Sequence, residues 1–153
     1  MSRHRRKYAP KKAESQGFGD PKMSYTDRFG KKRSDSFCMI FESLLQAAAY
    51  IDLTDKQKSL YILCASQLYG HRKPEKDHKD IPELQGDDIF YLNWREVHER
   101  YGMYSAGNHS RFYKDMQVLQ EHGFIKQIAS GKAQHAKSVW QLDWHWQIWK
   151  KDG

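Results

Sequence analysis

Hydrophobic positions recur every three or four residues in three separate segments, and each segment predicts an amphipathic helix. The first helix is expected over residues 54–70, where Thr54 and Gln57 have the spacing of a capping box and Gly70 is a typical stop. An extended start and a short helical patch, around residues 43–50, precede it. Its inner face would carry Leu60, Leu63, Cys64 and Leu68.

The second helix is expected over residues 94–101, after a short strand at residues 89–93. Asn93 and Glu96 have the spacing to cap its start reciprocally. Its apolar face would carry Trp94, Val97 and Tyr101.

The third helix is expected over residues 108–122, and Gly123 would supply the left-handed residue that ends it. Its apolar stripe would carry Phe112, Met116 and Leu119. Two strands follow, at residues 124–129 and 138–149, and a basic turn at residues 130–137 joins them. This part of the chain is therefore predicted to fold as a helix followed by an antiparallel ribbon.

The order of these elements predicts the fold class. Three helices, a short strand between the first two, and a closing ribbon are the order of a winged helix-turn-helix. We predict an α+β fold over residues 37–149, with a three-helix core and a two- to three-stranded antiparallel sheet. Residues 71–88 have a net charge of −2, two prolines and no apolar period, which predicts a long exposed loop inserted in the domain.

Tryptophans are concentrated near the end of the sequence. Alternation places Trp140, Leu142 and Trp144 on one side of the last strand, which predicts that they face the helices. Trp146 and Trp149 follow, in a segment that either turns helical or packs against a second copy. An exposed remainder would indicate a dimer surface.

Charge is distributed unevenly along the 153 residues. Residues 1–36 carry eleven Lys and Arg against four Asp and Glu, whereas residues 37–153 carry fifteen of each, so the whole net charge of +7 lies in the first segment. With few aromatic residues, that basic segment is predicted to be a mostly disordered tail. It either binds phosphate backbones through counterion release or serves only solubility.

The outer face of the third helix supplies candidate contacts to DNA. At about 100° per residue, the side opposite Phe112 carries Ser110, Arg111, Lys114 and Gln117. Arginine can fork to guanine, glutamine can pair with adenine, and lysine and serine can hold phosphates. Asn108, His109 and Ser110 would lie at the helix start, where backbone N–H groups reach a phosphate or a base edge. Any surface helix also has a polar outer face.

The turn of the ribbon supplies a second group of candidates. Lys132, His135 and Lys137 suit contacts with phosphates or with the minor groove. The alternative is an ordinary soluble turn.

Several classes of function are not supported by the sequence. The histidines lie on separate predicted elements without paired ligand spacing, so we expect no metal site, and nothing suggests a cofactor or an assembled catalytic site. Cys38 and Cys64 lie in apolar surroundings and are read as reduced thiols. Without a long apolar run or a signal sequence, the protein is expected in the cytoplasm and not in a membrane.

Several short motifs support a resemblance. They are an F-x-x-I segment at 37–40, Leu53-Thr54, a Lys-x-x-Tyr helix at 58–61, the strand-to-helix junction at 91–94, and L-x-x-x-G-F-I at 119–125. On these, residues 37–145 resemble the winged-helix proteins of plasmids, phages and conjugative elements of Gram-positive bacteria, including the N-terminal domains of plasmid replication initiators. Initiators carry a further domain, whereas this sequence ends at Gly153, so the resemblance implies an accessory factor or a regulator.

The sequence thus predicts a non-enzymatic protein that binds double-stranded DNA, with a role in replication, transfer or transcription of a mobile element. A homodimer would suit paired half-sites, although the sequence contains no heptad pattern. The alternative is a winged-helix module for protein interaction in a replication or conjugation assembly. It would use the Trp-rich end and the acidic loop.

Overall fold

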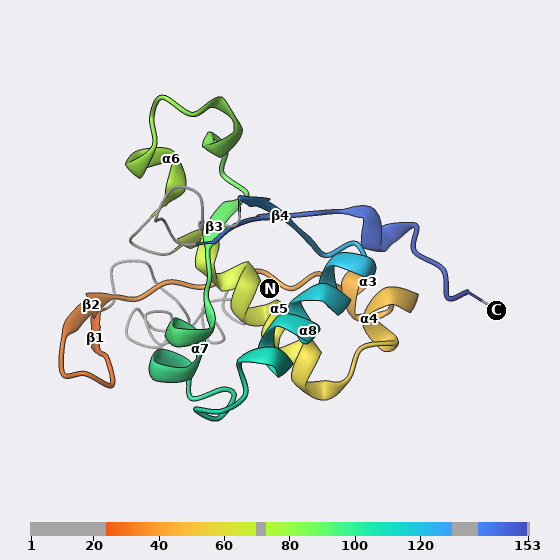
Figure 1. Ribbon diagram of the computed structural model, residues 1–153, viewed down its shortest axis with the longest axis horizontal. Helices are drawn as coiled ribbons and strands as arrows, with labels where there is room; N and C mark the ends of the chain where they lie inside the picture. The colour runs from red at the N-terminus through yellow and green to blue at the C-terminus, as the bar shows by residue number, and fades with distance from the viewer. Residues whose placement is uncertain (1–23, 70–72, 130–137, 153) are drawn as a thin grey trace, which may run out of the picture. The chain divides into compact units, whose positions relative to one another are not determined.

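The computed structural model describes residues 24–69, 73–129 and 138–152 (Figure 1). The chain divides into two compact units, residues 1–37 and 38–153. In the first unit, the strands β1 (Ser24–Thr26) and β2 (Lys32–Ser34) pair antiparallel as a hairpin. A mostly disordered tail was predicted over residues 1–36, and residues 24–34 of that segment form this hairpin. Residues 1–23 lie outside the described part.

The second unit is a mixed α+β structure, which confirms the predicted class. In chain order its elements are α3 (Glu42–Leu45), α4 (Ala48–Ile51), α5 (Asp55–Ser66), η1 (Gln67–Tyr69), α6 (Pro74–Asp77), η2 (Pro82–Leu84), β3 (Ile89–Tyr91), α7 (Trp94–Tyr101), α8 (His109–Glu121), β4 (Ile125–Ala129), β5 (Val139–Leu142) and η3 (His145–Gln147). The expected helix–strand–helix–helix–ribbon succession is therefore present. The short helices α3 and α4 occupy the patch predicted around residues 43–50.

The sheet of the second unit has the strand order β3-β5-β4, and both pairings are antiparallel. Trp140 of β5 lies opposite Phe90 of β3, and Leu142 lies opposite Ile125 of β4. β5 is thus the central strand. The predicted ribbon gains β3 as its third strand, within the two to three strands expected.

One hydrophobic core fills the space between the helices and the inner face of the sheet. The expected stripe of α8 is buried, with Phe112, Met116 and Leu119 at 0%, 1% and 0% exposure, and α8 packs against α5 (Figure 1). Leu60 and Cys64 of α5 are also fully buried. Further members of this core are Phe90, Leu92, Val97, Phe124, Ile125 and Trp140.

The two cysteines are free thiols with different surroundings. Cys64 lies in the middle of α5 and is fully buried, and this burial raises the pKa of its thiol well above the ordinary value of 9.0. Cys38 is half-buried at the start of the second unit.

The helix α5 begins as expected. Thr54 Oγ1 accepts a hydrogen bond from Gln57 N at 3.3 Å, and Gln57 Oε1 accepts one from Thr54 N at 3.0 Å, which completes the capping box. The predicted stop, Gly70, lies outside the described residues. The α-helix itself ends at Ser66 and continues as the 3₁₀ turn η1, so half-buried Leu68, expected on the α-helix, lies in η1.

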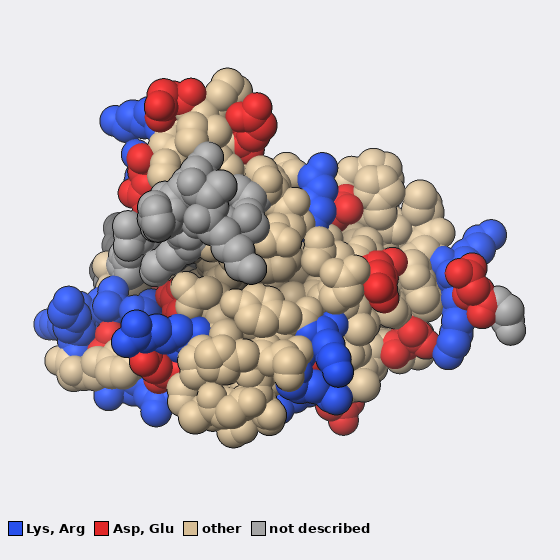
Figure 2. All heavy atoms as spheres, in the orientation of Figure 1, with Lys and Arg blue, Asp and Glu red and all other residues tan. Residues whose placement is uncertain are grey.

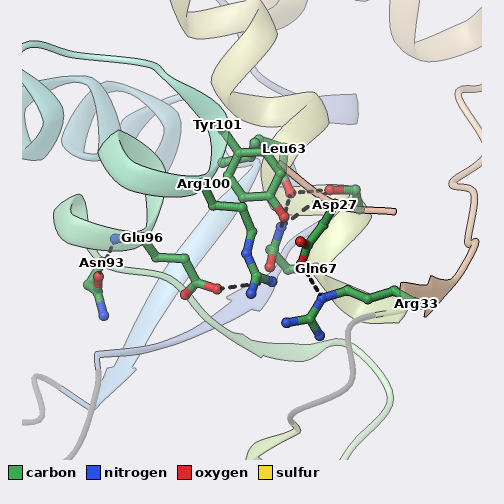
Figure 3. A network of polar contacts seen from close by, with 9 residues as sticks. Asp27, Arg33, Leu63, Gln67, Asn93, Glu96, Arg100 and Tyr101 are labelled. Atoms are coloured by element: carbon green, nitrogen blue, oxygen red, sulfur yellow. Dashed lines mark hydrogen bonds and ion pairs between the residues drawn. The ribbon is translucent and has the colours of Figure 1, made fainter. Parts of the chain in front are cut away.

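Gln67 and Asn93 hold the ends of two helices (Figure 3). Gln67 Nε2 donates to Leu63 O at 3.3 Å and to Tyr101 Oη at 2.9 Å, which links the end of α5 to α7. Asn93 Oδ1 accepts from Glu96 N at 2.9 Å. The expected reciprocal cap is absent because the Glu96 carboxylate lies 3.8 Å from Arg100 Nη1 instead.

Gly123 ends α8 as predicted. Its φ of 83° is left-handed, its N–H donates to Gln120 O at 3.0 Å, and Phe124 N donates to Leu119 O at 2.9 Å, the two bonds of a Schellman motif. The chain also crosses close to this glycine, since a Cβ there would lie 2.6 Å from the backbone N of Trp146. Glycine is therefore required at position 123 both for the left-handed backbone and for the close approach of the chain at Trp146.

The tryptophans do not all lie as the alternation predicted. Trp140 is buried and Leu142 is half-buried, but Trp144 is 59% exposed. The strand β5 ends at Leu142 and the chain turns into η3, so the alternation no longer applies at Trp144. Trp146 and Trp149 pack against the core instead.

The segment predicted as an exposed loop at residues 71–88 is folded in its described part, from residue 73 on. It contains α6 and η2, and Leu84 is only 2% exposed. Leu84 forms a second small cluster with Ile89, Tyr91 and Val139. These three residues lie on the outer face of the sheet, so the segment covers that face and β3 is buried on both sides. The segment has few apolar residues and no apolar period, so its sequence did not predict this role.

Candidate nucleic-acid interface

The outward face of α8 brings together the described members of the predicted site. All six of these residues are exposed: Asn108, His109, Ser110, Arg111, Lys114 and Gln117. Because the helix turns by about 100° per residue, Ser110, Lys114 and Gln117 lie on the side opposite the buried Phe112. The helix therefore has one apolar and one polar side, and the polar side faces solvent.

Arg111 lies at the edge of this polar face. Its Nε is 3.8 Å from Asp115 Oδ1, while the side chain remains 58% exposed. An ion pair of this length at the surface contributes little stability. The guanidinium is thus oriented by Asp115 and stays accessible to a ligand.

Asp115 is a buried carboxylate beneath the face. It accepts hydrogen bonds from Gln57 Nε2 at 3.0 Å and from Tyr104 Oη at 2.6 Å. Gln57 belongs to the capping box of α5, and Tyr104 belongs to the turn between α7 and α8. Because a buried carboxylate is costly unless it is hydrogen-bonded, these partners fix the position of α8 relative to both neighbours.

The turn before α8 is held in a strained conformation. Tyr104 has a φ of 61°, which is left-handed and unusual for a residue other than glycine. Its ring packs edge-on against Phe112 at 5.6 Å, and its carbonyl oxygen lies 2.6 Å from His98 Nδ1. Burial and the bond to Asp115 raise the pKa of the Tyr104 phenol far above its ordinary value. The start of α8 is therefore fixed by several contacts.

His109 has a packing role in addition to its exposed position. Its ring stacks on Trp94 with centroids 3.6 Å apart, and Trp94 stacks in turn on His98 at 5.1 Å. One face of the His109 ring is thus covered by α7. A contact from His109 to a ligand would have to use the ring edge.

The far end of the face carries an acidic residue. Gln117 Nε2 donates to Glu121 Oε1 at 3.3 Å, and Gln120 Nε2 donates to Gln117 Oε1 at 3.4 Å. These bonds are long and exposed, so they exchange easily with water or with a ligand. Positive charge on α8 is consequently concentrated in its first half, at Arg111 and Lys114.

The predicted contacts of the ribbon turn, Lys132, His135 and Lys137, lie outside the described residues. The strands that lead into this turn are described, and β4 is tied to α8 because Gln127 N donates to Gln120 Oε1 at 3.2 Å. Lys126 on β4 is exposed beside it. The ribbon therefore starts immediately next to the polar face.

Sequence reasoning missed Asp115 and Tyr104. A signal for Asp115 was present, because it lies next to Met116 at an inward position of the apolar stripe. A carboxylate at such a position needs donors from other elements. Nothing in the sequence identified Gln57 and Tyr104 as those donors, since they are 58 and 11 residues away.

Comparisons of the chain with protein-family models, with curated proteins and with solved structures give no match. In the part that the structure describes, no group of three or more His, Cys, Asp or Glu side chains is arranged to bind a metal ion. No helix among the same residues is both long enough and apolar enough to cross a membrane. The geometry of α8 is thus the main basis for a functional hypothesis.

Proposed function

We propose that this protein binds double-stranded DNA as a winged helix-turn-helix, with the polar face of α8 in the major groove. The order α5, β3, α7, α8, β4, β5 and the sheet order β3-β5-β4 support this fold. The observation that carries the proposal is the two-sided character of α8. It buries Phe112, Met116 and Leu119 and exposes Arg111 and Lys114.

The proposed contacts follow from side-chain chemistry. Arg111 donates in a fork to a guanine, and Gln117 pairs with an adenine after leaving its bond to Glu121. Lys114 and Ser110 hold phosphates, and Asn108 and the first backbone N–H groups of α8 lie where a phosphate approaches. An α-helix with its side chains is about 10–12 Å wide, which matches a major groove of about 12 Å.

The ribbon turn, with Lys132, His135 and Lys137, would contact the DNA backbone or the minor groove beside α8. The protein would act without catalysis, as an accessory factor or regulator of a plasmid, phage or conjugative element. That biological setting rests on the resemblance of residues 37–145 to winged-helix proteins of such elements.

Binding of a DNA site selected from a random pool tests the proposal. We expect Arg111→Ala to weaken the selected site by about 1–3 kcal/mol, the contribution of a forked guanine contact. Lys114→Ala should lower the slope of log affinity against log salt by about 1. Equilibrium binding of labelled duplex across a salt series measures both effects.

Arg95→Ala is the matched control, because Arg95 is also an exposed arginine paired with an acid four residues away, Glu99 at 3.1 Å. It should leave the affinity unchanged. Equal affinities for the Arg111 and Arg95 variants would refute reading of bases by α8. A parent protein that fails to bind duplex at low salt would refute the whole proposal.

An apolar groove favours a second candidate, a module for protein interaction. A cavity of about 280 Å³ lies between the segment before α3 and the last strand. Met39, Phe41 and Trp144 line it and are 63%, 61% and 59% exposed. Surfaces of this kind mark interaction sites more often than isolated exposed side chains do. This candidate function does not depend on DNA binding, so it would remain the proposal if the protein did not bind duplex DNA.

A further inference from the structure

The turn of the β1–β2 hairpin is held by one carboxylate. Asp27 Oδ1 accepts from Phe29 N at 2.9 Å and from Lys31 N at 2.8 Å, and Asp27 Oδ2 accepts from Arg33 Nε at 2.6 Å. The bond from Arg33 and the backbone bonds lower the pKa of the Asp27 carboxyl. No apolar side chain of residues 24–34 is buried, so these bonds are what gives the turn its defined shape.

The backbone of the turn is that of a three-residue hairpin loop. Gly30 N donates to Asp27 O at 2.9 Å, Asp27 N donates to Lys31 O at 2.8 Å, and Gly30 has a φ of 81°. Arg28 and Phe29 therefore occupy the tip. The sequence signal is Asp27 followed by Gly30, the residues that a type I turn favours at its first and fourth positions.

One face of the ribbon is built for phosphate contact. Thr26 lies opposite Lys32, and Ser24 lies opposite Ser34. Since side chains alternate between faces, these four residues share one side, and all four are exposed. Hydroxyl and lysine groups are common donors to DNA phosphates. Tyr25 and Arg33, which pair with each other, share the other side.

The tip carries an exposed aromatic ring. Phe29 is 58% exposed, and the Arg28 guanidinium carbon lies 5.9 Å from its ring centroid. Lys31 is exposed directly after the tip. Figure 2 shows Lys and Arg side chains gathered over the hairpin. The hairpin thus combines exposed cationic side chains with an apolar ring at its tip, which suits a polyanionic ligand that also has apolar faces.

We propose that the hairpin is a second DNA-binding element, which grips duplex phosphates through its hydroxyl and lysine face and inserts Phe29 between base pairs in the minor groove. The proposal rests on the DNA-binding function proposed above and adds a site to it. Proteins that bend DNA use single apolar wedges in this way. Single-stranded DNA is bound by rows of aromatic residues, whereas this ribbon has a single aromatic at its tip.

Two variants of the full chain test the proposal. Lys31→Gln with Lys32→Gln should lower the slope of log affinity against log salt by about 2, since each phosphate contact contributes about 0.9. Lys76→Gln with Lys79→Gln removes the same charge from exposed positions at α6 and is the control. Equal slopes for the two double variants would overturn the phosphate contacts.

Phe29→Ala tests the wedge. A duplex containing 2-aminopurine should brighten when the parent protein binds, because insertion unstacks the probe base, and this increase should disappear with Phe29→Ala. An unchanged increase would overturn the wedge. Tighter binding of the parent to single-stranded than to duplex DNA, lost with Phe29→Ala, would overturn the choice of duplex.

The α8 variants separate this proposal from the first. If Arg111→Ala and Lys114→Ala weaken binding but the hairpin variants do not, the hairpin site fails and the function of α8 stands. If only the hairpin variants weaken binding, the hairpin site stands and reading by α8 fails. No binding of duplex by the parent overturns both.

Discussion

At the scale of single residues, the structure depends on a few side chains whose partners are distant in sequence. Asp115 illustrates this, because its two donors come from the start of α5 and from the turn before α8. Local patterns predicted Thr54, Gln57 and Gly123 correctly, since caps depend on neighbours three or four residues away. Burial of Asp115 depends on tertiary packing and could not be predicted in the same way.

Gly123→Ala should destabilise the protein by at least about 1–3 kcal/mol, the cost of a left-handed backbone at a residue with a Cβ. The backbone N of Trp146, 2.6 Å from that Cβ, adds to this cost. Gly107→Ala is the control, because a Cβ there meets no atom within 4 Å. Urea denaturation measures both, and equal midpoints for the two variants would contradict the close approach of the C-terminal segment.

At the scale of elements, helices were predicted well and irregular segments poorly. The long, periodic stripe of α8 fixed its ends to within one residue of the expected 108–122. The segment over the outer face of the sheet and the β1–β2 hairpin were missed, because a few apolar contacts or a single Asp27 turn hold them. The polar face of α8 was predictable for the same reason as its stripe, whereas the stack of His109 on Trp94 was not.

A polar cluster joins the end of α4, the end of α8 and the C-terminal segment. Asp52 Oδ2 lies 2.8 Å from His122 Nε2, and Asp52 Oδ1 lies 2.9 Å from Lys151 Nζ. The His122 ring also stacks on Trp149 at 4.4 Å. The hydrogen bond from His122, followed by that from Lys151, lowers the pKa of the Asp52 carboxyl below its ordinary 3.8.

This cluster predicts a dependence of stability on pH. A carboxyl whose pKa is lowered in the folded state stabilises the protein at pH values above 3.8, its ordinary pKa in the unfolded chain. This contribution is lost as the pH falls through the lowered pKa of the folded state. The free energy of unfolding should therefore be lower for Asp52→Asn than for the parent at pH 5, and the two should converge as the pH falls below 3.8 and then through the lowered pKa of the folded state. Urea titrations at several pH values measure this. A constant difference over that range would contradict the ion pair.

At the scale of the whole molecule, the net positive charge and the proposed reading helix α8 lie in different parts of the chain. The net charge of +7 lies entirely in residues 1–36, and the charges of residues 37–153 sum to zero. Figure 2 shows acidic side chains gathered over the α6 segment, in keeping with its sequence. Affinity that depends on salt would come mainly from the first part, and selection of sequence would come from α8.

Deletion of residues 1–36 should therefore separate the two properties. We expect the salt dependence of duplex binding to become markedly shallower, because the deletion removes eleven Lys and Arg side chains that can neutralise phosphates. The ratio of affinities for a selected and a random duplex should stay within about threefold of the parent ratio, since Arg111 and Gln117 remain. Fluorescence anisotropy with both duplexes measures this. Loss of the preference together with the affinity would contradict a reading role for α8.

The unequal burial of the two thiols has a practical consequence. A maleimide dye will attach at half-buried Cys38 and leave Cys64, enclosed in α5, untouched. Cys38 follows directly on the boundary between the two units. A single dye can therefore be placed at that junction for distance measurements without any substitution in the sequence. Energy transfer from the dye to labelled DNA would then report the distance between this junction and a chosen position on the duplex.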